Sequence, residues 1–172
     1  MTEISNQKLS KIILLKAPII LLFISVLNEF DFNYLELKYF SFNFSYILIF
    51  YYSLKKSKSL GYGLIFIAGL FNDVIVGTPI GISSLFYLLI CVLAAYLRNI
   101  TLRPNLVKDW LFFLITIMFI NSFSYILLTF IFNYNINYLN LLINTNFTFL
   151  MYPVFSYLFF LFEEKIIGRY HD

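Results

Sequence analysis

The sequence predicts an all-α membrane protein, a bundle of about six transmembrane helices with both termini in the cytoplasm. Composition is the first reason, because 61% of the 172 residues are hydrophobic, 22% are aromatic and only 12% are charged. Soluble domains are about half apolar and about a quarter charged, and a chain this short could not bury so much apolar surface within itself. The second reason is that the apolar residues form separate runs of nearly membrane-spanning length. The third is that basic residues gather in alternate connections between those runs.

Each apolar run approaches the roughly 17–25 residues that a helix needs to cross the hydrocarbon core. The first carries Lys16 and Pro18 near its start, where a lysine can extend its ammonium to the headgroups and a proline costs little. The second is short and is diluted by Asn43 and Ser45, and the fifth is the longest. We expect a single polytopic domain over residues 1–172, with helices over residues 12–27, 40–54, 60–76, 82–97, 110–132 and 146–162.

Lysine and arginine are distributed unevenly over the connections. With alternate connections on opposite sides of the membrane, ten of the 12 basic residues fall on one side, Lys38 falls on the other, and Lys16 lies within a helix. Cytoplasmic connections carry the excess of basic residues, so this side and both termini are assigned to the cytoplasm. An odd helix count would scatter the basic connections, which favours six crossings. The uncharged, Asn-rich connection over residues 133–146 contains Tyr, Leu and Ile. We expect it to lie in the membrane interface, with a solvated loop as the alternative.

Residues that could carry catalysis are scarce. The single histidine, His171, lies in the charged tail, and the single cysteine, Cys91, lies in an apolar run, so neither a His pair for a metal nor a disulfide is available. Phosphate-binding glycine loops, paired aspartates and a serine–histidine pair are also missing. The sequence therefore predicts a protein that is not an enzyme, uses no cofactor or metal, and contacts membrane lipid rather than nucleic acid.

One segment stands out, because small residues and one acid recur every four residues from Gly69 to Gly81. This spacing keeps them on nearly one face of a helix, where a neighbouring helix can approach closely. Pro79 disfavours helical backbone at the residue before it, so residues 77–81 are expected to form a tight external hairpin between the third and fourth helices. The fourth helix offers a second small face, formed by Ser84, Cys91 and Ala95. We therefore expect helix packing or partner binding at Gly63, Gly69, Asp73, Gly77, Pro79 and Gly81.

Three polar or helix-breaking residues lie within apolar runs. Asp73 is the only acid in such a position, and it either reaches water and the amides of the turn or has a functional partner. Asn121, at the middle of the fifth helix, is expected to form a structural hydrogen bond between helices. Pro153 removes a backbone donor from the sixth helix, which predicts a kink or, alternatively, a hinge.

The segment around Asp73 resembles the rod shape-determining protein MreD family of bacteria. That family has a glycine-bearing third helix, an Asp–hydrophobic pair, a Gly-Ser/Thr-Pro-hydrophobic-Gly turn and an apolar fourth helix. The matching residues are Gly63 and Gly69, Asp73-Val74, Gly77-Thr78-Pro79-Ile80-Gly81, and Ser83 to Tyr96. Tyr152-Pro153 in the last helix is also similar, and the resemblance covers about a quarter of the chain, with the length and topology in agreement.

This resemblance implies a non-enzymatic scaffold of the bacterial inner membrane, within the cell-elongation machinery that maintains rod shape. Such proteins work beside MreC and, through the complex, beside the actin-like MreB and the synthases of lateral peptidoglycan. The family's helical arrangement is also similar to the substrate-binding subunits of vitamin transporters. Transport of a small vitamin is therefore the alternative, and it requires a polar external pocket that includes Asp73.

Overall fold

The computed structural model describes residues 16–27, 42–55, 60–101, 105–134 and 137–168, and within these ranges all regular secondary structure is helical. The prediction of an all-α chain is confirmed for this part of the sequence. Its helices are Lys16–Leu27, α2 (Phe44–Lys55), α3 (Tyr62–Val76), α4 (Ile82–Ile100), α5 (Leu106–Ile126), which continues into the π-helical turn η2 (Leu127–Ile131), and α6 (Tyr138–Gly168).

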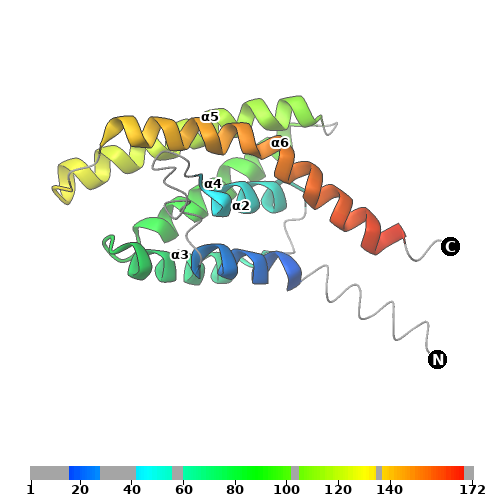
Figure 1. Cartoon of the computed structure of the whole chain (residues 1–172), viewed down its shortest axis with the longest axis horizontal. Helices are drawn as coiled ribbons and strands as arrows, with labels where there is room; N and C mark the ends of the chain where they lie inside the picture. Colours follow the sequence, from blue (N-terminus) through cyan, green and yellow to red (C-terminus); the bar gives the residue numbers. More distant parts are fainter. Residues whose placement is uncertain (1–15, 28–41, 56–59, 102–104, 135–136, 169–172) are drawn as a thin grey trace, which may run out of the picture.

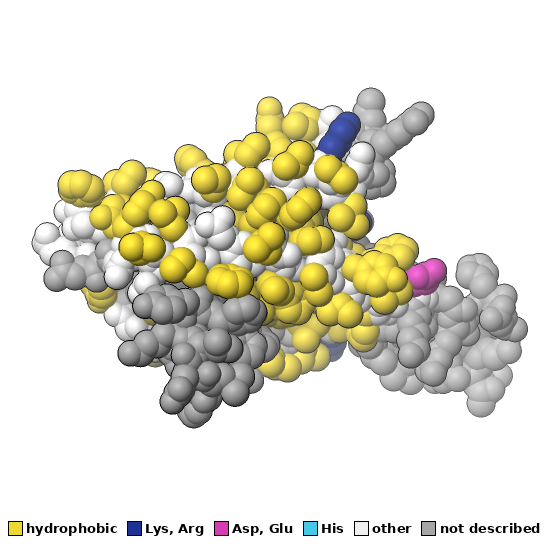
Figure 2. All heavy atoms as spheres, turned by 45° about the horizontal axis from the view of Figure 1, so that its top comes forward, with side chains coloured by type: hydrophobic (Ala, Val, Ile, Leu, Met, Phe, Trp, Pro, Cys, Tyr) yellow, Lys and Arg dark blue, Asp and Glu magenta, His cyan; other side chains and the backbone are white. Residues whose placement is uncertain are grey.

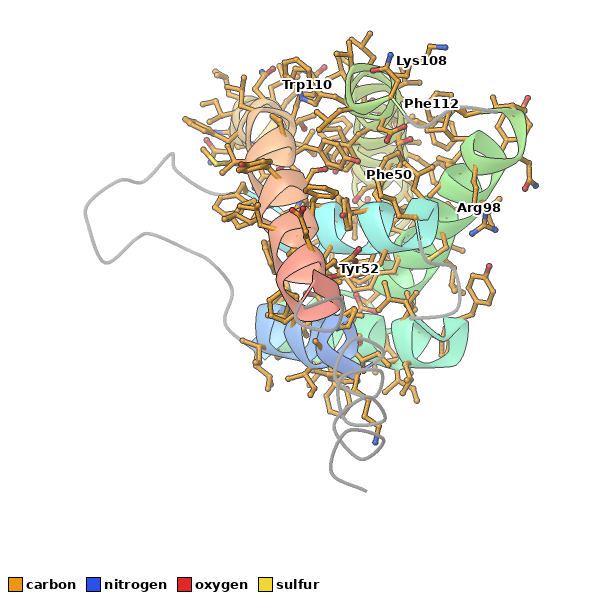
Figure 3. All side chains as sticks on the ribbon, turned by 90° about the vertical axis from the view of Figure 1, so that its right-hand side faces the viewer. Phe50, Tyr52, Arg98, Lys108, Trp110 and Phe112 are labelled. Atoms are coloured by element: carbon orange, nitrogen blue, oxygen red, sulfur yellow. The ribbon has the colours of Figure 1, made fainter. Side chains whose placement is uncertain are left out.

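The helices stack in layers (Figure 1). The long helices α5 and α6 lie side by side in one outer layer, α2 and α4 form the middle layer, and α3 and the helix Lys16–Leu27 form the opposite layer, an arrangement that Figure 3 shows from the side. Aromatic rings pack between layers: Phe50 of α2 lies 5.0 Å from Phe113 of α5, measured between ring centroids. The core therefore lies around the middle layer.

Helix α2 is the centre of this core. Ten of its 12 residues are buried, so it meets other helices on every side instead of presenting one face to lipid. At 1.5 Å per residue it is about 18 Å long, well short of the roughly 30 Å hydrocarbon core. A helix this short needs partners for its terminal backbone groups, and neighbouring helices supply them, as described below.

The outer surface is largely apolar. Figure 2 shows hydrophobic side chains over most of one face, and large exposed side chains such as Ile115, Phe130 and Val154 are more than half accessible. Within the described ranges, three helices are long and apolar enough to cross a membrane: Ile82–Ile100, Leu106–Ile131 and Tyr138–Glu164. The helices Lys16–Leu27 and Tyr62–Val76 are apolar but shorter. This surface has the character that lipid contact requires.

The last helix begins earlier than the sequence suggests, at Tyr138 instead of Asn146. Asn137 starts it, because its side-chain oxygen accepts from the Leu139 amide at 3.0 Å. The Asn146 amide donates to the Leu142 carbonyl one turn back, at 3.1 Å. Asparagine side chains thus bond within the helix, so the second half of the Asn-rich connection forms the first turns of α6.

Several expected features lie outside the described residues. These are the proposed helix residues 12–15 and 40–41, the acidic connection with Lys38, the basic residues Lys56, Lys58 and Arg103, and the tail with His171.

Candidate functional site

Helices α3 and α4 approach each other closely where they cross at Gly69. A Cβ atom built on Gly69 would lie 2.5 Å from the backbone nitrogen of Ser84 and 2.8 Å from its Oγ, so no side chain fits there. The Ser84 hydroxyl donates to the Phe66 carbonyl at 2.8 Å, which adds a hydrogen bond to the contact. Gly69 therefore packs against the serine of the second small face, and this side of α3 is covered by α4 within the same chain.

Asp73 holds the α3–α4 hairpin closed. Its carboxylate is fully buried and accepts three hydrogen bonds: from the Thr78 hydroxyl at 2.9 Å, from the Gly81 amide at 2.7 Å and from the Ser83 amide at 2.9 Å. The two amides belong to the N-terminus of α4, where a negative charge is favourable. Because the N-cap residue of α4 is Gly81, which has no side chain, Asp73 supplies the capping group from the preceding helix.

The glycines of the hairpin allow backbone conformations that other residues disfavour. Gly77 has φ +77° and Gly81 has φ +102°, in the left-handed region that a side chain disfavours, and a Cβ on either would meet no atom within 4 Å. The expected small strip therefore does not continue along one helix, because Gly77, Pro79 and Gly81 belong to the turn between Val76 and Ile82. The Gly77 amide donates to the Asp73 carbonyl at 2.9 Å and ends α3.

Gly63 lies apart from this contact. It is exposed near the start of α3, and a Cβ there would meet no atom within 4 Å, so it does not take part in the packing of α3 on α4. On α4, Cys91 faces α2 instead of α3: its sulfur accepts from the Ser53 hydroxyl at 3.4 Å. The predicted small face of α4 is thus divided between two neighbouring helices.

Asn121 joins α5 to α6. Its buried amide donates to the Thr145 hydroxyl at 2.7 Å, and that hydroxyl donates to the Leu141 carbonyl at 2.7 Å. The first of these bonds joins α5 to α6, as expected for an interhelical hydrogen bond at Asn121. The sequence names Asn121 but not its partner, because Thr145 falls within the Asn-rich segment that was expected outside the helix.

Pro153 has a partner that the sequence analysis missed. A proline inside a helix has no amide to offer the carbonyl four residues earlier, which here belongs to Phe149. The indole N–H of Trp110, on α5, donates to that carbonyl at 2.9 Å, and the Trp110 and Phe149 rings stack with centroids 4.6 Å apart. Figure 3 shows Trp110 between the two helices. The proline position is therefore held by α5, which favours a fixed bend over a hinge.

The ends of α2 are also held by distant residues. At its start, the Asn43 amide nitrogen donates to the Thr148 hydroxyl at 3.0 Å, and the Asn43 side chain donates to Asn144 at 3.1 Å. Near its end, the Arg98 guanidinium donates to the Ser53 carbonyl at 3.0 Å, where a positive charge suits the C-terminus of a helix. These bonds provide partners at both ends of the short central helix.

In comparisons with protein-family models, with curated proteins and with solved structures, nothing matches this chain. The arrangement of its own residues is therefore the basis for the functional argument. Among the described residues, no group of three or more His, Cys, Asp and Glu could hold a metal ion. The polar side chains that do cluster, around Asp73, Asn121 and Trp110, bond one helix to another.

A double-mutant cycle tests the pairing of Trp110 with Pro153. Trp110→Phe should leave the Phe149 carbonyl without a donor and lower the thermal midpoint, Tm, of the purified protein by about 2–4 °C, equivalent to about 1 kcal/mol. In a Pro153→Ala background the backbone amide of residue 153 can donate to that carbonyl, so Trp110→Phe should lower the Tm by less. Equal losses in both backgrounds would show that the indole contributes packing alone.

Proposed function

We propose that this protein is a non-enzymatic scaffold in the bacterial inner membrane that supports lateral peptidoglycan synthesis and rod shape, as the resemblance to MreD implies. The observation that carries the proposal is the use of Asp73. Its carboxylate is the most conspicuous polar group in the resembling segment, and it accepts three hydrogen bonds within one hairpin. A carboxylate that binds substrate or transfers protons would keep an oxygen free for that task. In a scaffold, a carboxylate that accepts hydrogen bonds from its own hairpin makes the hairpin rigid.

The proposal includes six membrane crossings with both termini in the cytoplasm. In support, helix ends that carry basic residues lie at the end of the bundle where α6 finishes (Figure 1): Lys16, Lys55, Arg98 and Lys108. The α3–α4 hairpin and the α5–α6 connection lie at the opposite end. Basic residues gather on the cytoplasmic side of membrane proteins, so this end would face the cytoplasm.

The proposed partners are MreC, which would contribute a single membrane helix, and through it MreB and the peptidoglycan synthases. Because α4 covers Gly69 and Asp73 is fully buried, the small-residue face is occupied by internal packing. A partner helix would instead meet the apolar outer surface, whose shape depends on the α3–α4 hairpin beneath it. The outer side chains of α3 include Phe66, Phe71 and Val74, which are between 43% and 68% exposed.

Depletion of the protein in the bacterium that encodes it tests the proposal directly. Cells that lose it should become round, and an affinity-tagged copy should retain MreC during purification. Replacing Asp73 or Gly77 with a bulky apolar residue should reduce both rescue of shape and recovery of MreC, because the hairpin would change conformation. Gly63→Ala, on an open surface of the same helix, is the matched control and should rescue fully. A depleted strain that keeps its rod shape would refute the scaffold function.

Vitamin transport requires an external polar pocket that includes Asp73. The three hydrogen bonds to its carboxylate come from the hairpin itself, so no observation at this residue favours that alternative. Stabilisation of the purified protein by one compound in a vitamin screen would revive it.

A further inference from the structure

One hydrogen bond joins the two outer layers of the bundle at its hairpin end, the end opposite the basic residues. The hydroxyl of Tyr134, in the connection that follows η2, donates to the Gly77 carbonyl of the α3–α4 hairpin at 2.9 Å. Figure 1 shows these two turns next to each other. Because α5 lies in one outer layer and α3 in the other, the bond connects the two layers directly.

The backbone before Tyr134 departs from a regular helix in two ways. The turn η2 is π-helical, so it holds about one residue more than a turn of α-helix. Asn133 has φ +54° and is, among the described residues, the only one other than glycine in the left-handed region. The Tyr134 amide donates to the Leu128 carbonyl at 3.0 Å and closes this widened turn. Departures of this kind cost free energy and concentrate at functional sites and switch regions.

The irregular turn carries the chain out of its helix and toward the hairpin of the other layer. Across the same connection, the Tyr125 and Tyr138 rings pack edge to face with centroids 5.5 Å apart, which ties the end of α5 to the start of α6. Within η2, the buried Thr129 hydroxyl has no hydrogen-bond partner in the described part of the chain, so it adds no bond that would stabilise the turn. The bond from Tyr134 to Gly77 is a stabilising contact that offsets the cost of the turn.

We propose that Asn133, Tyr134 and Gly77 form a latch, which holds the outer layers together at the hairpin end and opens without unfolding a helix. Tyr134 is 41% exposed, so water can replace the Gly77 carbonyl as the partner of its hydroxyl, and the bond is reversible. The hairpin keeps its conformation in both states, because the bonds to the Asp73 carboxylate do not involve Tyr134. Opening separates the two turns and frees the spacing of the outer layers at this end. The latch does not depend on the proposed cell-shape function.

Distances between two spin labels test the latch in the purified full chain. The labels are attached to cysteines that replace Ile80 in the hairpin and Ile131 in η2, both largely exposed, and Cys91→Ala removes the single native cysteine. Tyr134→Phe removes only the hydroxyl. It should raise the ratio of long to short distances about fivefold, the factor that corresponds to about 1 kcal/mol for one hydrogen bond. An unchanged distance distribution would overturn the proposal.

Two controls confine the effect to the latch. Tyr138→Phe, at an exposed tyrosine of the same connection, should leave the distance distribution as it is in the wild type. Labels at the basic end, on exposed Ile100 and Val107, should report the same distance with and without the Tyr134 hydroxyl. A change at both ends of the bundle would mean that the substitution loosens the whole structure, and the latch would be refuted.

Two substitutions at Asn133 test the contribution of the backbone. Asn133→Gly should keep the short distance, because glycine adopts positive φ without steric cost. Asn133→Val should raise the share of long distances about as much as Tyr134→Phe, because a β-branched residue is strongly disfavoured at φ +54°. If the valine variant kept the distances of the wild type, the left-handed turn would not position Tyr134 and the proposal would fail.

Discussion

Gly69→Ala is expected to destabilise the purified protein by about 3 kcal/mol, which corresponds to a fall of about 6–12 °C in Tm. The added methyl group would overlap the backbone of Ser84, and backbone atoms cannot move aside as a flexible side chain can. Helices α3 and α4 would have to separate, which would also stretch the hydrogen bond from the Ser84 hydroxyl to the Phe66 carbonyl. Thermal unfolding in detergent, followed by circular dichroism, measures the loss.

The control is the same substitution on the same helix at Gly63. That position is exposed and open, and alanine favours helix over glycine by about 0.5–1 kcal/mol, so Gly63→Ala should keep or slightly raise Tm. A pair of variants with equal Tm values would mean that α3 and α4 do not meet at Gly69. Replacing Ser84 with glycine in the Gly69→Ala background should recover little stability, because the overlap involves the backbone nitrogen and Cα of residue 84.

Asp73→Leu is the second substitution with a large expected effect. It removes the acceptor of three hydrogen bonds and leaves the amides of Gly81 and Ser83 without their partner at the start of α4. At about 1–3 kcal/mol for each unsatisfied donor, the loss should be about 3 kcal/mol or more. We expect a lower Tm and, in cells, a reduced amount of folded protein in the membrane fraction.

Asp73→Asn separates hydrogen bonding from bulk. The asparagine oxygen can still accept, but its amide group would face one of the donors that now point at the carboxylate, so the loss should be intermediate between wild type and Asp73→Leu. Thr78→Val, which removes only the hydroxyl donor, should cost the least of the three. If Asp73→Leu were as stable as the wild type, the carboxylate would not hold the hairpin, and a functional role for this acid would regain support.

The ends of the hairpin helices depend on local chemistry, and that part of the site could be predicted from the residues. Proline at position 79 and the glycines around it specify a turn whatever surrounds them, and α3 ends at Val76 and α4 begins at Ile82. Asn121 could also be singled out, since an amide in the middle of an apolar helix needs a partner. The predicted start of α6 was wrong by about two turns. Asparagine disfavours helix interiors unless its side chain bonds to the helix itself or to a neighbouring helix, so the Asn-rich segment was expected to lie outside the helix.

The sequence by itself determined the helical character of this chain, its apolar surface and the position of the turn between α3 and α4, because helical periodicity and turn preferences act over a few neighbouring residues. Tertiary structure alone decided which groups meet across the bundle. Trp110 lies 43 positions before Pro153, and only the packing of α5 on α6 brings the indole to the carbonyl that the proline leaves open. The burial of α2 on all sides is a further example, since a short apolar segment could equally well face lipid. Hydrogen-bond partners between distant segments depend on how helices pack, and that packing is a property of the whole chain.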